Sequence, residues 1–167
     1  RTRVRRVLED NGGAWDATMP YNSNAALAAA YTGGLDGVKI DVRVTADNVP
    51  VISHSSPIEL FESLDCYNRK IEDMTAAQVT ACHRLPSSTE TFQRLDDVLT
   101  YLRGKMVEQL CVKRSQDYAR TIAQVHAMAA NLAELGTGIV LLTGGEPFVR
   151  RDLPEIIGAF TTRGIHV

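Results

Sequence analysis

The sequence predicts an α/β fold in which parallel strands are connected by helices that cross over outside the sheet. Short runs rich in β-branched residues alternate with helical segments along most of the chain, an order typical of parallel sheets. The last run, GIVLLT (138–143), is apolar throughout, as expected of a strand covered on both faces. At 167 residues the chain is expected to form a single domain, 1–167, with a sizeable core.

Four segments have the composition of strands, being short and enriched in valine and isoleucine. They are residues 38–44, 49–53, 106–113 and 138–143. The tripeptide ADN (46–48) separates the first two and supplies residues that favour turns. We therefore expect the first two strands to follow one another closely.

Five segments are expected to be helices, since each has helical spacing of apolar residues or a high alanine content. They are residues 22–31, 75–82, 95–102, 115–135 and 152–162. Asn22, Ser23 and Thr75 are the expected caps at helix starts, and Gly136 and Gly164 are expected to stop the last two helices.

One region departs from this alternation. Residues 55–94 contain Pro57, Pro86 and neighbouring serines, and they are expected to form an inserted excursion from the regular fold.

The overall composition excludes some classes of function. The net charge of −2 gives no overall positive field that would attract nucleic acid. The sequence contains no run of 18 apolar residues, the length that could span a membrane. Cys66, Cys82 and Cys111 are odd in number and widely spaced, so they are expected to be reduced thiols. The expected location is the cytoplasm.

Five ordered segments resemble the glycerophosphodiester phosphodiesterase family over residues 11 to about 128. They are NGGAW (11–15), PYNS (20–23), VKIDVRVTADNVPVISHSS (38–56), YNRKIEDMTAAQV (67–79) and RLDDVLTYLRGK (94–105), followed by LCVK (110–113). The resemblance implies a TIM-type (βα) barrel. Because the chain has room for about six strands, we expect a partial or truncated barrel with an open sheet edge through which copies could self-associate.

The resemblance also implies which residues act. That family uses a calcium or magnesium ion held by several carboxylates, together with two histidines that transfer protons. Here the second histidine is retained as His54 and a single metal-ligand position as Asp41. The other positions are replaced: the three carboxylates by Tyr21, Lys39 and Cys111, the first histidine and its arginine by Asn11 and Gly12, and the aspartate after the second histidine by Ser55.

Strand alternation places the retained and replaced side chains relative to one another. Residues two apart on a strand share a face, so Lys39 projects beside Asp41, and Cys111 beside Lys113. We expect an ion pair from Lys39 or Lys113 to Asp41, and these two lysines as the substrate-binding residues. One carboxylate beside a lysine would hold no metal well, so we expect no cofactor unless family activity survives with calcium or magnesium.

The C-terminal stretch, about 136–167, resembles a different family. TGGEPFVRRDLPEIIGAFTTRGIHV (143–167) is similar to part of a radical S-adenosylmethionine enzyme, in which GGEP contacts the cofactor. The resemblance implies cofactor binding by Gly144, Gly145 and Glu146. However, the CxxxCxxC triplet that would hold the iron–sulfur cluster is absent from the sequence, and a structural turn is the competing interpretation.

The leading hypothesis is a phosphodiesterase-like barrel with most metal and catalytic residues replaced, impaired or inactive, whose partner is a small phosphodiester or phosphate ligand. Three alternatives stay open. The chain could retain hydrolase activity through Asp41 and His54, represent a radical S-adenosylmethionine enzyme fragment without its cluster, or be a non-catalytic structural or interaction domain.

Overall fold

The computed structural model describes residues 18–87, 89–113, 118–142 and 150–167. Its strands are β1 (Gly37–Val44), β2 (Pro50–Ile52) and β3 (Val107–Val112). Its helices are α1 (Asn24–Thr32), α2 (Ala76–Thr80), α3 (Leu95–Leu102), α4 (Tyr118–Glu134) and α5 (Leu153–Thr161), with a 3-10 turn, η2, at Ile71–Asp73.

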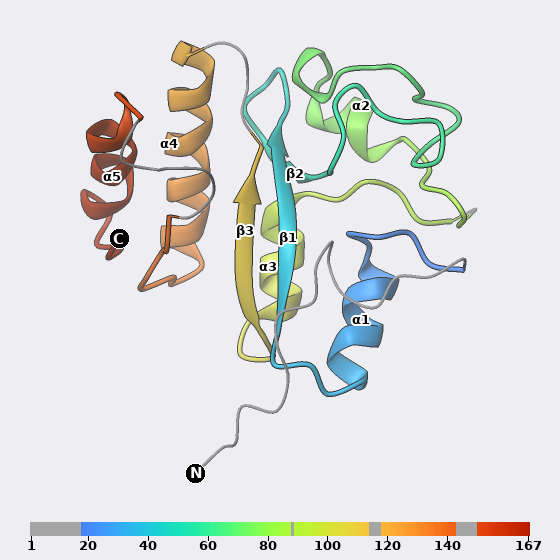
Figure 1. Ribbon diagram of the computed structural model, residues 1–167, viewed down its shortest axis with the longest axis horizontal. Helices are drawn as coiled ribbons and strands as arrows, with labels where there is room; N and C mark the ends of the chain where they lie inside the picture. The colour runs from blue at the N-terminus through green and yellow to red at the C-terminus, as the bar shows by residue number, and fades with distance from the viewer. Residues whose placement is uncertain (1–17, 88, 114–117, 143–149) are drawn as a thin grey trace.

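The strands form one sheet of order β2-β1-β3. β1 and β3 are parallel, as predicted, whereas β2 folds back on β1 as an antiparallel hairpin. Figure 1 shows α4 and α5 on one side of the sheet and α1 and α2 on the other. The described part of the excursion, 55–87 and 89–94, lies largely toward the carboxyl ends of β1 and β3, on the same side of the sheet as α1.

The two faces of β1 have different roles. Val38, Ile40 and Val42 are fully buried in the main core, which α3 joins with four apolar residues at helical spacing, as the sequence predicts. The opposite face carries Lys39, Asp41 and Arg43. Because burial of the apolar face fixes the register of β1, it also fixes where this polar row points.

The expected helix caps are largely confirmed. Ser23 caps α1, and Thr75 forms a capping box with Gln78 at the start of α2. Gly136 follows α4 with a φ of +80°, a conformation that favours glycine.

The prediction that 138–143 joins the sheet beside the other parallel strands is wrong for the described residues. Ile139 forms one isolated parallel bridge, with His166, and does not pair with β3. Apolar composition favours burial, but it does not determine which strand a segment pairs with. Among the described residues no strand covers this segment, and Ile139 and Leu141 are 75% and 80% exposed. The described sheet has three strands instead of about six.

The outer edge of β2 is covered by the excursion. Ile52 N–H donates to Gln93 O at 2.8 Å, and Val51 bridges Arg94. In the described residues β3 forms the other edge of the sheet. Self-association through that edge stays a prediction.

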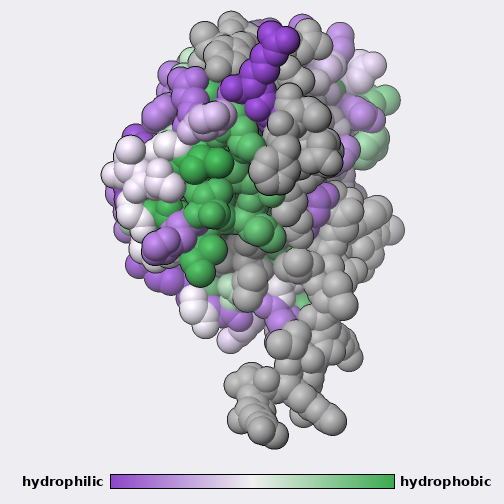
Figure 2. All heavy atoms as spheres, turned by 60° about the vertical axis from the view of Figure 1, so that its left-hand side comes forward, coloured by the Kyte–Doolittle hydropathy of each residue, from purple (hydrophilic) through white to green (hydrophobic). Residues whose placement is uncertain are grey.

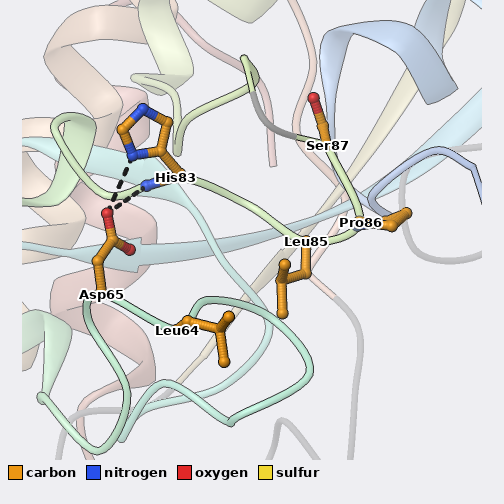
Figure 3. Close-up of a pocket in the computed structure, with 6 residues that line it drawn as sticks. All are labelled: Leu64, Asp65, His83, Leu85, Pro86 and Ser87. Carbon is orange, nitrogen blue, oxygen red and sulfur yellow. Dashed lines mark hydrogen bonds and ion pairs between the residues drawn. The ribbon is translucent and has the colours of Figure 1, made fainter.

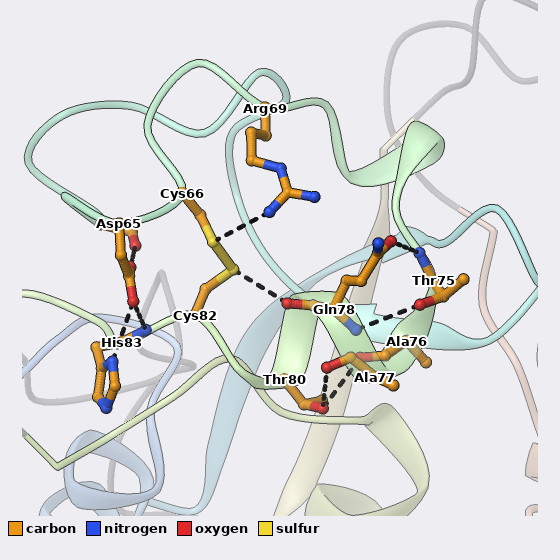
Figure 4. Close-up of a disulfide and its surroundings, with 11 residues drawn as sticks. Asp65, Cys66, Arg69, Thr75, Ala76, Ala77, Gln78, Thr80, Cys82 and His83 are labelled. Atoms are coloured by element: carbon orange, nitrogen blue, oxygen red, sulfur yellow. Dashed lines mark hydrogen bonds and ion pairs between the residues drawn. A yellow bond between two sulfur atoms is a disulfide. The ribbon is translucent and has the colours of Figure 1, made fainter.

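The expectation of reduced thiols is wrong for two of the three cysteines. Cys66 and Cys82 form a disulfide with their Cα atoms 5.8 Å apart, while Cys111 is free (Figure 4). Sequence spacing did not reveal this pair because tertiary packing brings it together: both cysteines lie in a second core built around the excursion. The cytoplasmic location stays a prediction.

Two features of the described residues concern the molecular surface. No helix among the described residues is both long and apolar enough to cross a bilayer. Figure 2 shows an apolar area on the side of the molecule where α4 and α5 lie.

Reduction of the disulfide is expected to lower the free energy of unfolding by about 3 kcal/mol, because the bridge constrains the unfolded chain. Urea denaturation with and without dithiothreitol measures this. The Cys66→Ser/Cys82→Ser double variant serves as the control, since reductant should leave it unchanged. Equal stability of the oxidised and reduced chains would show that the bridge contributes nothing.

Candidate functional site

Asp41 is the centre of the polar row. It is fully buried, and its carboxylate Oδ1 lies 2.8 Å from Lys113 Nζ and 3.7 Å from Lys39 Nζ. The Lys113 backbone N–H donates to Val42 O at 2.8 Å, which fixes Lys113 at the carboxyl end of β3 beside β1. The expected ion pair is confirmed, and both lysines take part in it.

Asn22 supports Asp41 from the segment before α1. Its Nδ2 donates to Asp41 Oδ2 at 3.3 Å, and its Oδ1 accepts from the Asp41 backbone N–H at 3.4 Å. Asn22 has a φ of +51°, which asparagine tolerates better than most residues. The sequence suggested Asn22 only as a possible helix cap, a role that Ser23 fills.

Arg84 secures Asn22 from the excursion. Its Nη1 donates to the Asn22 carbonyl at 2.8 Å, and its guanidinium lies 5.0 Å from the Tyr21 ring centroid and 4.6 Å from that of Phe92. Arg84 is 1% exposed, and burial lowers its pKa, although it keeps its charge beside nearby carboxylates. Sequence analysis missed Arg84, because the excursion carries no motif that marks it.

Tyr21 stands where the resemblance implies a metal-binding glutamate. Its hydroxyl donates to Glu62 Oε1, and Glu62 itself is 1% exposed. Burial and this hydrogen bond both raise the pKa of Tyr21, so the phenol stays protonated as a donor. Glu62 is therefore a buried carboxylate at the site that sequence analysis also missed, and it is engaged by tyrosine.

His54 follows β2 and is held by its backbone. Its carbonyl accepts from Arg43 Nε at 3.0 Å and Nη2 at 2.8 Å, while Arg43 also pairs with Glu72 at 3.0 Å. The exposed imidazole has Nδ1 3.2 Å from Ser55 Oγ, and its ring centroid lies 6.1 Å from that of Tyr21. This arrangement fixes the chain at His54 and leaves its ring accessible.

The described side chains do not fit a calcium or magnesium ion. Such ions need several oxygen ligands, yet Asp41 faces two ammonium groups, and Cys111 lies beside it in register across β1 and β3. Within the described ranges, no group of three or more histidine, cysteine, aspartate or glutamate side chains could hold a metal.

Several predicted site residues lie outside the described residues. They are Asn11, Gly12, Gly144, Gly145 and Glu146. Their assigned roles stay predictions.

A comparison with known families shows to which family the chain belongs. The model of the "Glycerophosphoryl diester phosphodiesterase family" matches residues 14–151, most of the chain. The chain belongs to this family. The match runs beyond residue 128, where the sequence resemblance to these phosphodiesterases ends, and includes part of the C-terminal stretch.

Individual family members support the assignment. The chain is 33% identical over 116 residues to glycerophosphodiester phosphodiesterase 1 of Rattus norvegicus, covering 66% of this chain but about a third (32%) of that protein. The solved glycerophosphodiester phosphodiesterase of Agrobacterium tumefaciens matches 90% of this chain and 63% of its own, with a TM-score of 0.68 at 21% identity.

A solved Oleispira antarctica phosphodiesterase, in complex with the product sn-glycerol-3-phosphate, matches 77% of this chain and 52% of its own, with a TM-score of 0.66 at 21% identity. These phosphodiesterases have TIM-barrel folds, so the predicted α/β class with a partial barrel is confirmed. A GTP 3',8-cyclase of Marinobacter nauticus is 42% identical over only 45 residues, 27% of this chain and 14% of that protein, a weak hint of the second resemblance.

Lys113 is the lysine closer to Asp41, and its loss is expected to destabilise the folded chain. Lys113→Met should lower the free energy of unfolding by about 2–4 kcal/mol, since it leaves the buried Asp41 carboxylate with one distant cation. Lys39→Met should cost less, and adding Asp41→Asn to Lys113→Met should recover part of the loss. Urea denaturation of the variants checks this order, and equal stability of both lysine variants and the wild type would contradict it.

Proposed function

We propose that this chain binds a small phosphate-bearing ligand at the carboxyl end of its sheet, with lysine ammonium groups in place of the family's divalent metal. Lys113 and Lys39 provide the cations, and His54 is the third residue of the proposed binding site. Hydrolysis of phosphodiesters is impaired, because the residues that would hold a metal and supply the first proton-transfer group are replaced.

The observation that carries this proposal is the charge around Asp41. Two ammonium groups lie within 3.7 Å of one fully buried carboxylate, so these three side chains together carry two positive charges and one negative charge. Two cations at one point would attract an anionic phosphate oxygen, which accepts hydrogen bonds from ammonium groups. Both lysine side chains are about a quarter exposed, so a ligand can reach them.

Comparison with the Oleispira enzyme supports a phosphate ligand, since that family member holds sn-glycerol-3-phosphate. This chain spans about a third of the length of the rat relative and about half of the Oleispira enzyme. The site described here is formed by the residues of that shared part. Glycerol phosphate is therefore a suitable first probe.

The chemistry open to the described residues is limited. His54, hydrogen-bonded to Ser55, could accept a proton from an attacking hydroxyl group or water. Protonation of the leaving oxygen would need a second group, and Asn11 stands where the family resemblance implies the first histidine. We infer that binding is retained better than turnover.

The alternatives have weaker support. A radical S-adenosylmethionine enzyme would need three cysteines in a CxxxCxxC triplet, which the sequence lacks, and the cyclase similarity covers 45 residues. Replacement of the metal-binding residues favours a non-catalytic interaction domain. That hypothesis does not explain why two lysines lie beside one buried aspartate.

Affinity for calcium and magnesium is expected to be weaker than about 1 mM, since the one central carboxylate is already neutralised. Lys39→Glu/Cys111→Glu should recover measurable binding, because Cys111 pairs in register with Asp41 and both new carboxylates would share its face. Lys39→Gln/Cys111→Gln is the matched control, which removes the cation and adds no ligand. Calorimetric titration showing micromolar binding by the wild type would refute the expectation.

Hydrolysis of glycerophosphocholine is expected to be near background, because a missing proton-transfer group typically costs about 10²–10⁴-fold in rate. Choline release should be the same for the wild type, His54→Ala and the control His126→Ala on α4. A clear turnover that disappears in His54→Ala alone would establish the alternative, an active enzyme. Calorimetric titration with glycerol 3-phosphate tests binding separately, with Lys39→Gln/Lys113→Gln expected to lose it.

A further inference from the structure

The Cys66–Cys82 disulfide lies close in the chain to a residue that supports the candidate site. Cys82 stands two positions before Arg84, whose Nη1 donates to the Asn22 carbonyl at 2.8 Å. The Asn22 side chain in turn donates from Nδ2 to Asp41 Oδ2 at 3.3 Å. The disulfide is therefore connected to the buried carboxylate of the phosphate site through Arg84 and Asn22.

Arg84 is held in its buried position by few polar contacts. Its side chain is 1% exposed, yet Nε and Nη2 have no hydrogen-bond partner among the described residues. A buried donor without a partner is costly, because it has lost its hydrogen bonds to water. The guanidinium lies instead over the rings of Tyr21 and Phe92, 5.0 and 4.6 Å from their centroids. Arg84 would gain hydration by leaving the interior, so its position depends on the packing of the excursion.

That packing is provided by the second core, of which the disulfide is a part. This core contains both cysteines together with Phe92, one of the two rings that Arg84 contacts. Small hydrophobic cores commonly rely on a cross-link. The main core shares no residue with the second one, so it can stay folded when the second core loosens.

Other contacts between the two cysteine-bearing segments are weaker than the covalent bond. Asp65 Oδ2 accepts from the His83 backbone N–H at 3.1 Å and lies 3.0 Å from His83 Nδ1, as Figure 3 shows. The two side chains are 46% and 59% exposed, so water weakens their attraction. The Glu62 carbonyl accepts from Leu85 N–H at 2.9 Å. Without the disulfide, the segment that carries Arg84 would depend on individual hydrogen bonds that water can replace.

The surroundings of the disulfide favour reaction with a small dithiol. Cys66 is 5% exposed but belongs to a loop whose other residues, 64–65 and 67–70, are all exposed. Arg69 Nη1 lies 3.9 Å from Cys66 Sγ, where its positive charge would attract a thiolate (Figure 4). A shallow cleft of about 360 Å³ is lined in part by Asp65 and His83, the sequence neighbours of the two cysteines.

We propose that the Cys66–Cys82 disulfide is a redox switch for the phosphate site: the oxidised chain holds Arg84 against Asn22 and binds phosphate, and reduction by a dithiol releases Arg84 and weakens binding. This inference rests on the proposed function and adds the regulation of its site.

The reaction is thiol–disulfide exchange. A thiolate of the dithiol attacks Cys66 Sγ, the S–S bond breaks, and the Cys82 sulfur leaves as a thiolate that takes up a proton. The second thiol of the reductant then displaces the Cys66 sulfur, which is protonated in the same way. Two electrons and two protons pass to the chain, and the dithiol becomes a disulfide.

Reduction removes no contact to phosphate, since Lys39 and Lys113 lie on β1 and directly after β3. It lowers the fraction of chains in which Asn22 is fixed and supports Asp41, so Arg84 acts as a positioning residue. The apparent Kd rises as the competent fraction falls, and a fall to about a tenth raises it about tenfold.

Calorimetric titration of the 167-residue chain with glycerol 3-phosphate, before and after treatment with dithiothreitol, measures the switch. A thiol assay shows that the bridge is open, and circular dichroism shows that the chain is folded. Reduction is expected to raise the Kd about tenfold, and reoxidation to restore it. Cys66→Ser/Cys82→Ser should bind as weakly as the reduced chain, with or without dithiothreitol.

Two further variants separate the proposed connection from a general loosening of the excursion. Arg84→Met should bind as weakly as the reduced chain in both redox states, because the contact with Asn22 is absent in each. Thr75→Ala is the matched control, since it removes the capping box of α2 and leaves Arg84 untouched. It should keep the affinity of the oxidised chain and the response to reduction.

Each other outcome overturns a specific part. Equal affinity of the oxidised and the folded reduced chain would refute the switch and leave the phosphate site standing, whereas no binding in either state would refute both. Unfolding of the whole chain on reduction, or a bridge that dithiothreitol cannot open in the folded chain, would show that the disulfide is structural. A response to reduction that persists in Arg84→Met would exclude Arg84 as the connection.

Discussion

The buried carboxylate of Asp41 is the constraint on which the site depends. A charge with no exposure to water is costly unless it is paired and hydrogen-bonded. Lys113 and Lys39 neutralise it, and Asn22 binds both its side chain and its backbone. Because these partners come from β3, β1 and the segment before α1, satisfying one carboxylate aligns three parts of the chain at the carboxyl end of the sheet.

The excursion completes this arrangement from outside the regular fold. Arg84 reaches the Asn22 carbonyl, and Glu62 accepts from Tyr21, so residues far along the sequence fix the segment that supports Asp41. The disulfide and the second core hold the excursion together. The excursion therefore supports the site through Arg84 and Glu62.

Local sequence rules predicted what depends on neighbouring residues. The α/β class, the bounds of α3, the caps at Ser23 and Thr75 and the shared face of Lys39 and Asp41 follow from periodicity and turn chemistry. The Cys66–Cys82 pair, Arg84 and Glu62 could not be predicted, because their contacts span up to 62 positions and depend on how the excursion folds. Residues 138–143 were misassigned because apolar composition does not specify a partner strand.

A crystal structure of the chain grown with calcium chloride and glycerol 3-phosphate tests the central claim most directly. Our account predicts Lys113 Nζ in contact with Asp41, the phosphate beside Lys39 and Lys113, and no calcium at this carboxylate. A calcium ion coordinated by Asp41, with both lysines turned away, would contradict it.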